Sequence, residues 1–428
     1  KITCQNFWRR THFDASALEL SADSSVIYDE SHENFSRFNK EQKDICKTVL
    51  QCPSIYCVQG PPGTGKTDVL GEIASTLILS GKNVVILAKT HHAVNNALNK
   101  VWSICSNAPI FKIGAKLKSE GMVKSIHNYE KYYQYQKAYR KRASYINYKG
   151  DVVGMTLQGA IINLGLQNTN FRPDVILVDE ASQLTLAESS VIGVFGPCSI
   201  IFFGDDKQMP PIFHEKQKND RLSVSIFSHL IRLYPQYEGK LCITYRMNDE
   251  ITKLISQHFY EPNGERIIAS DFSKRRKLQL IGYHQDVRIN NILASKESVI
   301  SIDVSKEHTW EDYNPEEANF IACLIEHLLD LGMKVRDIAV VTPYRRQVLC
   351  IRKALRERLK DNISLVDTVE RLQGQDVDII IISFSVTSEE FYNDNAEFLL
   401  NKNRMNTMIS RAKKKVLLVK SKLFNLGF

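Results

Sequence analysis

The sequence lacks several features that would place it in common classes of protein. Its longest apolar runs fall well short of the roughly 20 residues that a membrane-spanning helix needs, and its start lacks the apolar core of a signal peptide. Its nine cysteines include no C-x-x-C pair, so neither a zinc site nor a disulfide framework is indicated. We therefore expect reduced thiols in an intracellular protein, cytoplasmic or nuclear, that has no membrane contact.

Length and composition set the next limits. The 428 residues exceed what one hydrophobic core usually holds, so two or more domains are expected. A hydrophobic fraction of 43% and a charged fraction of 24% are those of an ordinary globular protein. Because the chain starts at Lys1 rather than Met, we expect a piece of a longer protein whose flanking domains bind protein partners.

One motif organises the chain. Residues 60–67 read GPPGTGKT and match the phosphate-loop pattern G-x-x-x-x-G-K-[ST] without a mismatch. Apolar residues at 55–58 predict a buried strand before the motif, and their helical spacing at 68–79 predicts a helix after it. In this context Lys66 would reach the outer phosphates and Thr67 would hold Mg²⁺. The phosphates themselves would lie against the loop residues Gly60, Pro61, Pro62, Gly63, Thr64 and Gly65.

Further strand ends supply groups that hydrolysis needs. The apolar run 175–178 ends in Asp179 and Glu180, which predicts one carboxylate for Mg²⁺ and a second that polarises the attacking water. The run 199–203 leads to Gln208, whose amide can hydrogen-bond both water and a γ-phosphate oxygen. Upstream of the loop, Gln42 can pair with an adenine edge, and a surface position is the alternative.

A segment of different composition, 112–149, interrupts the first α/β pattern. It carries ten Lys and Arg against two Glu, and seven of the 17 tyrosines. Basic charge attracts phosphates and aromatic faces stack on unpaired bases, so a contact with single-stranded nucleic acid is one interpretation. A solvated helical pair whose tyrosines pack onto the main body is the other, and the two are compatible. We expect residues 105–149 to be a basic, tyrosine-rich helical insertion in the first domain.

Beyond residue 235 a second α/β pattern begins, without a phosphate loop of its own. Apolar runs at 338–342, 379–383 and 416–419 predict its strands. Two basic motifs contain Arg246 and Arg411, which would act as arginine fingers on a bound nucleotide, with surface ion pairs as the alternative. We therefore expect residues 1–35 to be the remnant of an accessory domain, 36–235 the first domain and 236–428 the second.

The ordered set of motifs resembles one family. The motifs are FNKEQ at 38–42, GPPGTGKT, HAVN at 92–95, VGMT at 153–156, DEASQ at 179–183, GDDKQMPP at 204–211, TYRM at 244–247, VTPYRRQ at 341–347, LQGQD at 372–376 and NRMNTMISRAKK at 403–414. Together they resemble the superfamily-one helicases of the up-frameshift and senataxin-like group. A guanine-specificity motif (N/TKxD) is not evident, which argues against a GTPase.

The resemblance implies an α/β fold of two tandem RecA-like domains with ATP between them, and 5′→3′ movement on single-stranded nucleic acid. It implies that Gln42 contacts adenine, that Tyr245 stacks on it, and that Asp376, where the family often has Glu, lies at the ribose. Arg246 and Arg411 would be the two fingers. The motifs that hold the nucleic-acid backbone in this family contain Thr90, Thr156, Thr342 and Thr368.

Two functions share this ATPase site. The first is a helicase, expected to be a monomeric motor core, that uses ATP to open duplexes. The second is an ATP-gated clamp or scaffold that holds nucleic acid, recruits partners and unwinds little. The motifs fit both, and they fit RNA as well as DNA, because recognition of a 2′-hydroxyl group is not visible in a sequence.

Overall fold

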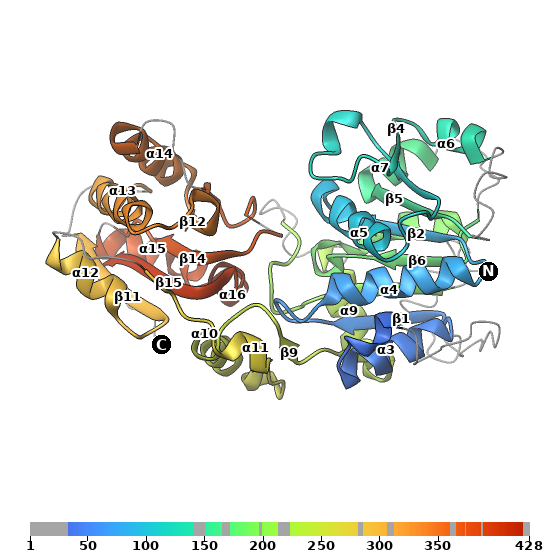
Figure 1. The fold of residues 1–428 in the computed structure, drawn as a ribbon, viewed down its shortest axis with the longest axis horizontal. Helices are drawn as coiled ribbons and strands as arrows, with labels where there is room; N and C mark the ends of the chain where they lie inside the picture. Colours follow the sequence, from blue (N-terminus) through green and yellow to red (C-terminus); the bar gives the residue numbers. More distant parts are fainter. Residues whose placement is uncertain are drawn as a thin grey trace. The chain divides into compact units, whose positions relative to one another are not determined.

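The computed structural model describes residues 33–139, 150–164, 172–196, 199–212, 223–280, 286–305, 312–359, 365–372, 374–386 and 388–422. The chain divides into two compact units (Figure 1). Unit 1 runs to Leu241, except for Pro61–Thr64 and Lys207–Met209, which belong with the residues from Cys242 onward in unit 2. Residues 1–32 of the expected accessory remnant and 140–149 of the expected insertion lie outside the described residues.

Unit 1 is built on a parallel sheet with the strand order β4-β3-β5-β2-β6-β7-β1-β8. Its strands are β1 (Ile55–Gln59), β2 (Val84–Ala88), β3 (Ile110–Ile113), β4 (His127–Tyr129), β5 (Val152–Thr156), β6 (Val175–Val178), β7 (Ser199–Gly204) and β8 (Glu238–Lys240). The central strands are buried along their whole length, which is why they read as unbroken apolar runs.

Helices cover both faces of this sheet. They are α2 (Glu33–Ser36), α3 (Lys40–Leu50), α4 (Lys66–Leu79), α5 (His91–Ile104), α6 (Tyr132–Tyr139), α7 (Leu157–Leu164), α8 (Leu186–Ser189) and α9 (Ile226–Leu233). Alternate residues of β2 enter two different cores. Val84 and Ile86 pack with residues of α3, α4 and α5, whereas Val85 and Leu87 pack with residues of α6, α7 and α9. This is the layering of an open α/β sheet.

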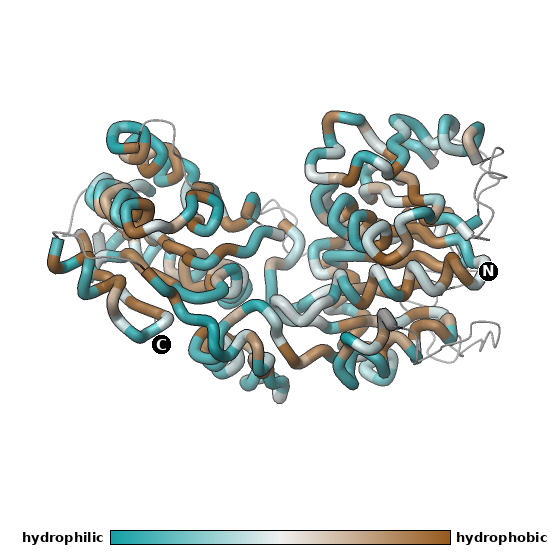
Figure 2. Tube along the Cα trace, in the orientation of Figure 1, coloured by the Kyte–Doolittle hydropathy of each residue, from teal (hydrophilic) through white to brown (hydrophobic). Residues whose placement is uncertain are grey.

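Unit 2 contains a second parallel sheet, with the order β11-β15-β14-β12-β13. Its strands are β11 (Val299–Ser305), β12 (Ile338–Thr342), β13 (Leu365–Thr368), β14 (Val377–Ser383) and β15 (Ala412–Ser421). A short separate pair is formed by β9 (Ile243–Thr244) and β10 (Ile268–Ala269). In both units the central strands are mostly brown in the hydropathy colouring of Figure 2, as expected for buried parallel strands.

The helices of unit 2 are α10 (Asp249–Ile255), α11 (Asp271–Lys274), α12 (Val287–Ala294), α13 (Pro315–Asp330), α14 (Arg345–Leu359), α15 (Glu389–Leu399) and α16 (Lys402–Ile409). Alternate residues of β14 again separate two cores. Ile379 and Ile381 pack with α13 and α14, whereas Ile380 and Ile382 pack with α10 and α16. No helix among the described residues is long and apolar enough to cross a membrane.

The α/β class and the strands expected from apolar runs are confirmed, as β1, β6, β7, β12, β14 and β15. The expected helix after the phosphate loop is α4. The domain boundary expected at residue 235 stays a prediction.

The basic segment differs in part from the expectation of a helical insertion. Its first half contributes β3 and β4, which extend the sheet of unit 1 at one edge, and α6 follows them. Two of its tyrosines, Tyr132 and Tyr135, are buried and pack against one another, and Tyr135 also packs against Phe111 of β3. Lys112 is buried as well, and burial lowers the pKa of its ammonium group to about 8. These residues follow the packing interpretation, because their side chains face the sheet rather than solvent.

Candidate functional site

The phosphate loop connects β1 to α4 within the expected strand–loop–helix arrangement. Gly63 and Gly65 have φ angles of 74° and 83°, a left-handed backbone that glycine adopts without steric cost. Helix α4 begins at Lys66, so its free amides and the positive end of its dipole lie where a phosphate would bind. The Lys66 ammonium group donates a hydrogen bond to the carbonyl of Gly60.

Asp179 and Glu180 follow β6 at the carboxyl edge of the same sheet. Asp179 is 6% exposed, and burial raises the pKa of its carboxyl group against the opposing effects of the Glu180 amide and the Lys66 charge. The Glu180 amide donates to Asp179 Oδ1 at 2.9 Å. Glu180 itself has a φ of 51°, which costs a residue with a side chain about 1 kcal/mol. Such strain is found at functional sites, and the catalytic role of Glu180 stays a prediction.

The oxygen groups of Thr67 and Asp179 are the hard ligands that Mg²⁺ prefers. Asp179 is also a buried carboxylate whose ionised form gains from a nearby cation, as its interaction with Lys66 shows. The residues present therefore fit a magnesium ion. A different group, Cys323, Glu326 and His327 on α13, also has ligand atoms close together. There Glu326 is paired with Arg358 at 3.0 Å and His327 Nδ1 lies 2.7 Å from the carbonyl of Cys323, so we assign it no metal.

Gln42 lies beside the phosphate loop. It is 3% exposed, and its Nε2 is 2.7 Å from the position that a Cβ on Gly65 would take. Its Oε1 accepts a hydrogen bond from the amide of Asn39, while the Asn39 side chain accepts one from the Gln42 amide. This capping box explains why Gln42 sits at the third position of α3, with its amide nitrogen turned toward the loop. An adenine contact by Gln42 stays a prediction.

Gln59 was not among the residues predicted from the sequence. It is the last residue of β1, and its Nε2 donates to Asp205 Oδ1 and to Asp206 Oδ1, both at 2.9 Å. This pair of bonds fixes the turn after β7 to the end of the strand that enters the phosphate loop. A polar side chain at the end of an otherwise apolar strand was the signal that could have identified it.

Within unit 2, the first half of the phosphate loop is bonded to the TYRM motif. The Thr244 hydroxyl donates to the carbonyl of Pro62 at 2.8 Å, and the Tyr245 amide donates to the carbonyl of Gly63 at 2.8 Å. A Cβ on Gly63 would lie 2.4 Å from Cβ of Arg246. Only glycine therefore allows this close approach. Tyr245 is 37% exposed, and stacking of its ring on adenine remains a prediction.

Arg246 and Arg411, the two predicted arginine fingers, both interact electrostatically with Asp376. Arg246 Nε lies 3.9 Å from Asp376 Oδ2, and Lys413 Nζ lies 2.9 Å from the same oxygen. Burial raises the pKa of Asp376, but Arg246, Lys413 and Arg411 together lower it below its ordinary value. Asp376 therefore holds the cations of two separate motifs in one place. Its predicted ribose contact stays a prediction.

Helix α16 holds the segment that contains Gln208. The carbonyl of Gln208 accepts a hydrogen bond from Asn403 Nδ2 at 2.5 Å, and the carbonyl of Lys207 accepts one from Asn406 Nδ2 at 2.8 Å. The Met209 amide donates to the hydroxyl of Thr407 at 3.2 Å. These three side chains are spaced i, i+3 and i+4 and share one helix face. Their helical spacing in the NRMNTM motif was the signal, although only Arg411 was predicted there.

The four threonines that are predicted to contact nucleic acid lie at or just after the carboxyl ends of parallel β-strands. This is the edge at which open α/β sheets bind ligands. Thr90 caps α5 just after β2, and Thr156 ends the neighbouring β5. In unit 2, Thr342 and Thr368 are paired in register on β12 and β13. Thr156, Thr342 and Thr368 are at most 6% exposed. The structure thus brings the threonines together in two pairs, and their contact with a strand stays a prediction.

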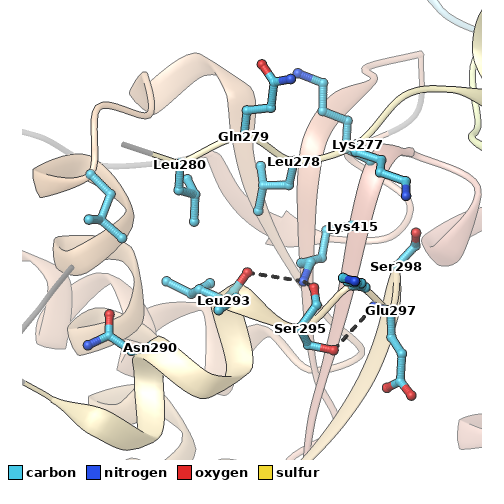
Figure 3. A pocket seen from close by; sticks show the side chains of 14 residues that line it. Lys277, Leu278, Gln279, Leu280, Asn290, Leu293, Ser295, Glu297, Ser298 and Lys415 are labelled. Atoms are coloured by element: carbon cyan, nitrogen blue, oxygen red, sulfur yellow. Dashed lines mark hydrogen bonds between the residues drawn. The ribbon is translucent and has the colours of Figure 1, made fainter. Parts of the chain in front are cut away.

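A cavity of about 440 Å³ lies elsewhere in unit 2 (Figure 3). The side chains of Leu278 and Leu293 point into it, and Lys415 donates to the carbonyl of Ser295 at 2.9 Å. Its wall includes Lys414, whose carbonyl accepts a hydrogen bond from Asn248. The wall of the cavity is therefore bonded to the residue that directly follows the TYRM motif, and none of the predicted site residues line it.

Comparison with known proteins gives consistent matches along the chain. Two families, each described as an AAA domain, match residues 37–217 and 222–422. The chain is 25% identical to the DNA replication ATP-dependent helicase/nuclease JHS1 of Arabidopsis thaliana, over 96% of this chain and 30% of that protein. It is 27% identical to the DNA replication ATP-dependent helicase/nuclease DNA2 of Saccharomyces cerevisiae, over 90% of this chain and 26% of that protein.

A third relative is the DNA polymerase alpha-associated DNA helicase A of Schizosaccharomyces pombe, which is 27% identical over 92% of this chain and 65% of that protein. The chain thus spans less than two thirds of the length of each of these relatives.

Proposed function

We propose that the chain is an ATP-hydrolysing helicase with tandem RecA-like domains, of the superfamily-one group that includes up-frameshift-like and Dna2-like helicases; two AAA-domain matches and the similarity to JHS1 and DNA2 support this. The observation that carries the proposal is the gathering of Arg246, Arg411 and Lys413 on Asp376, next to the TYRM segment that is bonded to the phosphate loop. Cations of two motifs held beside a phosphate loop suit the transfer of a phosphoryl group.

Each residue then has a chemical role in the proposed reaction. Lys66 neutralises charge on the outer phosphates, and Glu180 polarises the attacking water. Thr67 and Asp179 hold Mg²⁺, which supplies charge stabilisation for the leaving group. Arg246 and Arg411 stabilise the charge that develops as the phosphoryl group is transferred.

Gln208 provides the connection between the nucleotide and the rest of unit 2. Its backbone is held by Asn403 of α16, and the chain reaches Arg411 two residues after that helix ends at Ile409. A change in the γ-phosphate contact of Gln208 is therefore transmitted to α16 and to the finger that follows it. This supports the coupling of hydrolysis to movement along a strand.

We propose single-stranded DNA as the nucleic acid, because two of the relatives are named as helicase/nucleases of DNA replication and the third as a DNA helicase. Movement in the 5′→3′ direction follows from the family resemblance. A monomeric motor core of two domains, 36–235 and 236–428, inside the cell, completes the proposal. An ATP-gated clamp that unwinds little is the second candidate function, since it uses the same residues.

The test combines ATP hydrolysis with strand separation. ATPase rates are measured with matched DNA and RNA single strands, and unwinding is measured on duplexes with a 5′ or a 3′ tail, with Lys66→Ala as the inactive control. The helicase proposal expects stimulation by DNA and opening of the 5′-tailed duplex. Hydrolysis that responds to single strands, without opening of any tailed duplex, would identify the clamp. A rate that neither strand changes contradicts both functions.

A further inference from the structure

A buried carboxyl group lies at the carboxyl ends of β12 and β14 in unit 2. It belongs to Glu317, in the first turn of α13, whose side chain is 0% exposed. Glu317 Oε2 accepts hydrogen bonds from the Ser383 hydroxyl at 2.6 Å and from the Ser385 amide at 3.1 Å. A carboxyl group is rarely buried without a cationic partner in direct contact, so its position here calls for a reason.

The hydrogen bonds around Glu317 form a chain with a defined direction. The backbone amide of Asn314 can only donate, and it donates to Gln347 Oε1 at 2.7 Å. The other end of the Gln347 amide is therefore Nε2, which donates to the Ser383 hydroxyl at 2.9 Å. The hydroxyl hydrogen of Ser383 is left to donate to Glu317. α13, α14 and the end of β14 are thus tied together through one carboxyl group.

The same carboxyl group holds a strained turn. Ser385 has a φ of 57°, a left-handed backbone that costs a residue with a side chain about 1 kcal/mol. Its amide is one of the two groups that donate to Glu317 Oε2. A charge-assisted hydrogen bond stabilises by about as much as this strain costs, so Glu317 keeps the chain in this conformation as it leaves the sheet.

The turn at Ser385 lies beside Thr342, one of the residues predicted to contact a nucleic-acid strand. Val341 of β12 is in register with Ile382 of β14, so the next residues on the two strands are Thr342 and Ser383. Among the described residues, the buried oxygens without a hydrogen-bond partner include the Thr342 hydroxyl, the Ser385 hydroxyl and Glu317 Oε1. Buried polar atoms of this kind are costly unless a ligand or water pairs with them in another state of the protein.

We infer that Glu317 is a positioning residue for strand binding, because through Ser383 and Ser385 its carboxyl group fixes the end of β14 beside Thr342. The inference rests on the proposed function, since it assumes that Thr342 contacts the backbone of a nucleic-acid strand. It adds a residue that lies in none of the motifs of the family resemblance.

The charge of Glu317 gives this arrangement a pH dependence. Burial raises the pKa of the carboxyl group to about 7, against the opposing effects of the Ser383, Ser385 and Phe384 hydrogen bonds and of Lys420. Charged groups on the neighbouring elements are paired with one another, as Lys420 with Asp303, Arg346 with Asp312 and Arg358 with Glu326. Both forms of Glu317 are therefore populated near neutral pH.

The ionised form of Glu317 lowers the affinity for a strand whose phosphate would lie at Thr342. A unit charge about 8 Å from a phosphate, in a medium of effective dielectric constant about 40, changes the affinity roughly fivefold. Strand affinity should therefore fall as the pH rises through about 7, because the proton on Glu317 is lost.

The experiment measures the Kd of the whole chain for a fluorescein-labelled single-stranded DNA between about pH 6 and about pH 8. Glu317→Gln keeps an oxygen for Ser383 and Ser385 but cannot ionise, so its Kd should stay near the low-pH value of the wild type. Glu326→Gln is the matched control, because Glu326 lies on the same helix and pairs with Arg358. It should keep the wild-type pH profile.

A third variant separates positioning from stability alone. Glu317→Leu keeps the volume but offers no acceptor, so strand affinity should be weaker at every pH while Glu317→Gln binds normally at low pH. If Glu317→Gln keeps the wild-type pH profile, the inference is wrong. Equal affinity of the Leu variant and the wild type also contradicts it. If the wild-type chain binds no strand at all, the proposed function fails and this inference fails with it.

Discussion

Replacing Gly63 by alanine tests whether the phosphate loop and the TYRM segment act as one assembly in unit 2. The new Cβ would lie 2.4 Å from Cβ of Arg246 and 2.7 Å from the hydroxyl oxygen of Thr244. Atoms in good van der Waals contact are about 3.5–4 Å apart, so one side must move by about 1 Å. The shift would break the hydrogen bonds from Thr244 to Pro62 and from Tyr245 to Gly63.

The expected magnitude has two parts. The left-handed backbone of Gly63, with φ of 74°, costs alanine about 1 kcal/mol. Overpacking against Arg246 adds about 1–3 kcal/mol. Gly264 offers a matched control, because its φ is 75° and a Cβ on it would meet nothing within 4 Å. Alanine at Gly264 should therefore cost only about 1 kcal/mol. The difference of about 2 kcal/mol corresponds to a factor of roughly 30 in an equilibrium constant.

The assay is the kcat/KM for ATP in the presence of saturating single-stranded DNA, with thermal unfolding measured in parallel. Gly264→Ala should keep kcat/KM within about twofold of the wild type, whereas Gly63→Ala should lower it by roughly 30-fold or more. Equal kcat/KM values for the two variants would refute the reasoning, because they share the backbone strain and differ only in the crowding by Arg246 and Thr244.

Three further outcomes are expected. Lys66→Ala should abolish ATP hydrolysis because it removes the positive charge that neutralises the outer phosphates, whereas Lys89→Ala, which removes an ion pair with Glu188, should not; normal turnover by the Lys66 variant would contradict the site. Arg411→Ala should leave nucleotide affinity largely intact and lower kcat on the order of 10³-fold, and a near-wild-type kcat would exclude it as a finger. For stability, the pKa of Glu317 rises from 4.5 to about 7 on folding, so the folded state binds this proton more tightly. The proton on Glu317 stabilises the folded state by about 3 kcal/mol, and this stabilisation is complete below pH 4.5 and is lost as the pH rises to about 7. The free energy of unfolding in urea should therefore differ between wild type and Glu317→Gln by an amount that changes by about 3 kcal/mol over this pH range. A difference that does not vary with pH would contradict the prediction.

The strands that could be predicted from the sequence are those buried on both faces. The run that became β6 is entirely apolar and the one that became β14 contains an unbroken stretch of isoleucines, because helices cover both sides of the sheet. β3 was missed for the opposite reason. Lys112 interrupts its four residues, and a lysine in a basic segment suggests a solvated surface. In the structure its Nζ donates to the carbonyl of Lys118, which is a partner that local patterns do not predict.

The loop chemistry was predictable because one short motif contains it, whereas the supporting contacts join distant segments. Gln59 meets Asp205 across 146 positions in the sequence, and Glu317 meets Ser383 across 66. Each of these residues is of a polar type that is ordinarily found on the surface, so its sequence position alone does not mark it. Only the fold places them in contact, so sequence reasoning found the residues expected to touch ATP and missed those that hold them.

The supporting contacts also explain how a small change at a nucleotide could move a large element. Asn403, Asn406 and Thr407 bind the backbone of residues 207–209 from one face of α16, which is eight residues or about 12 Å long. If this helix moves as a rigid body, these bonds would carry Gln208 with it, and Arg411, two residues beyond the end of the helix, would follow. Asp376 then restrains Arg411 and Arg246 together through its charge. Sensing by Gln208 and stabilisation by the fingers would on this basis be one motion rather than two, with α16 as the connecting part.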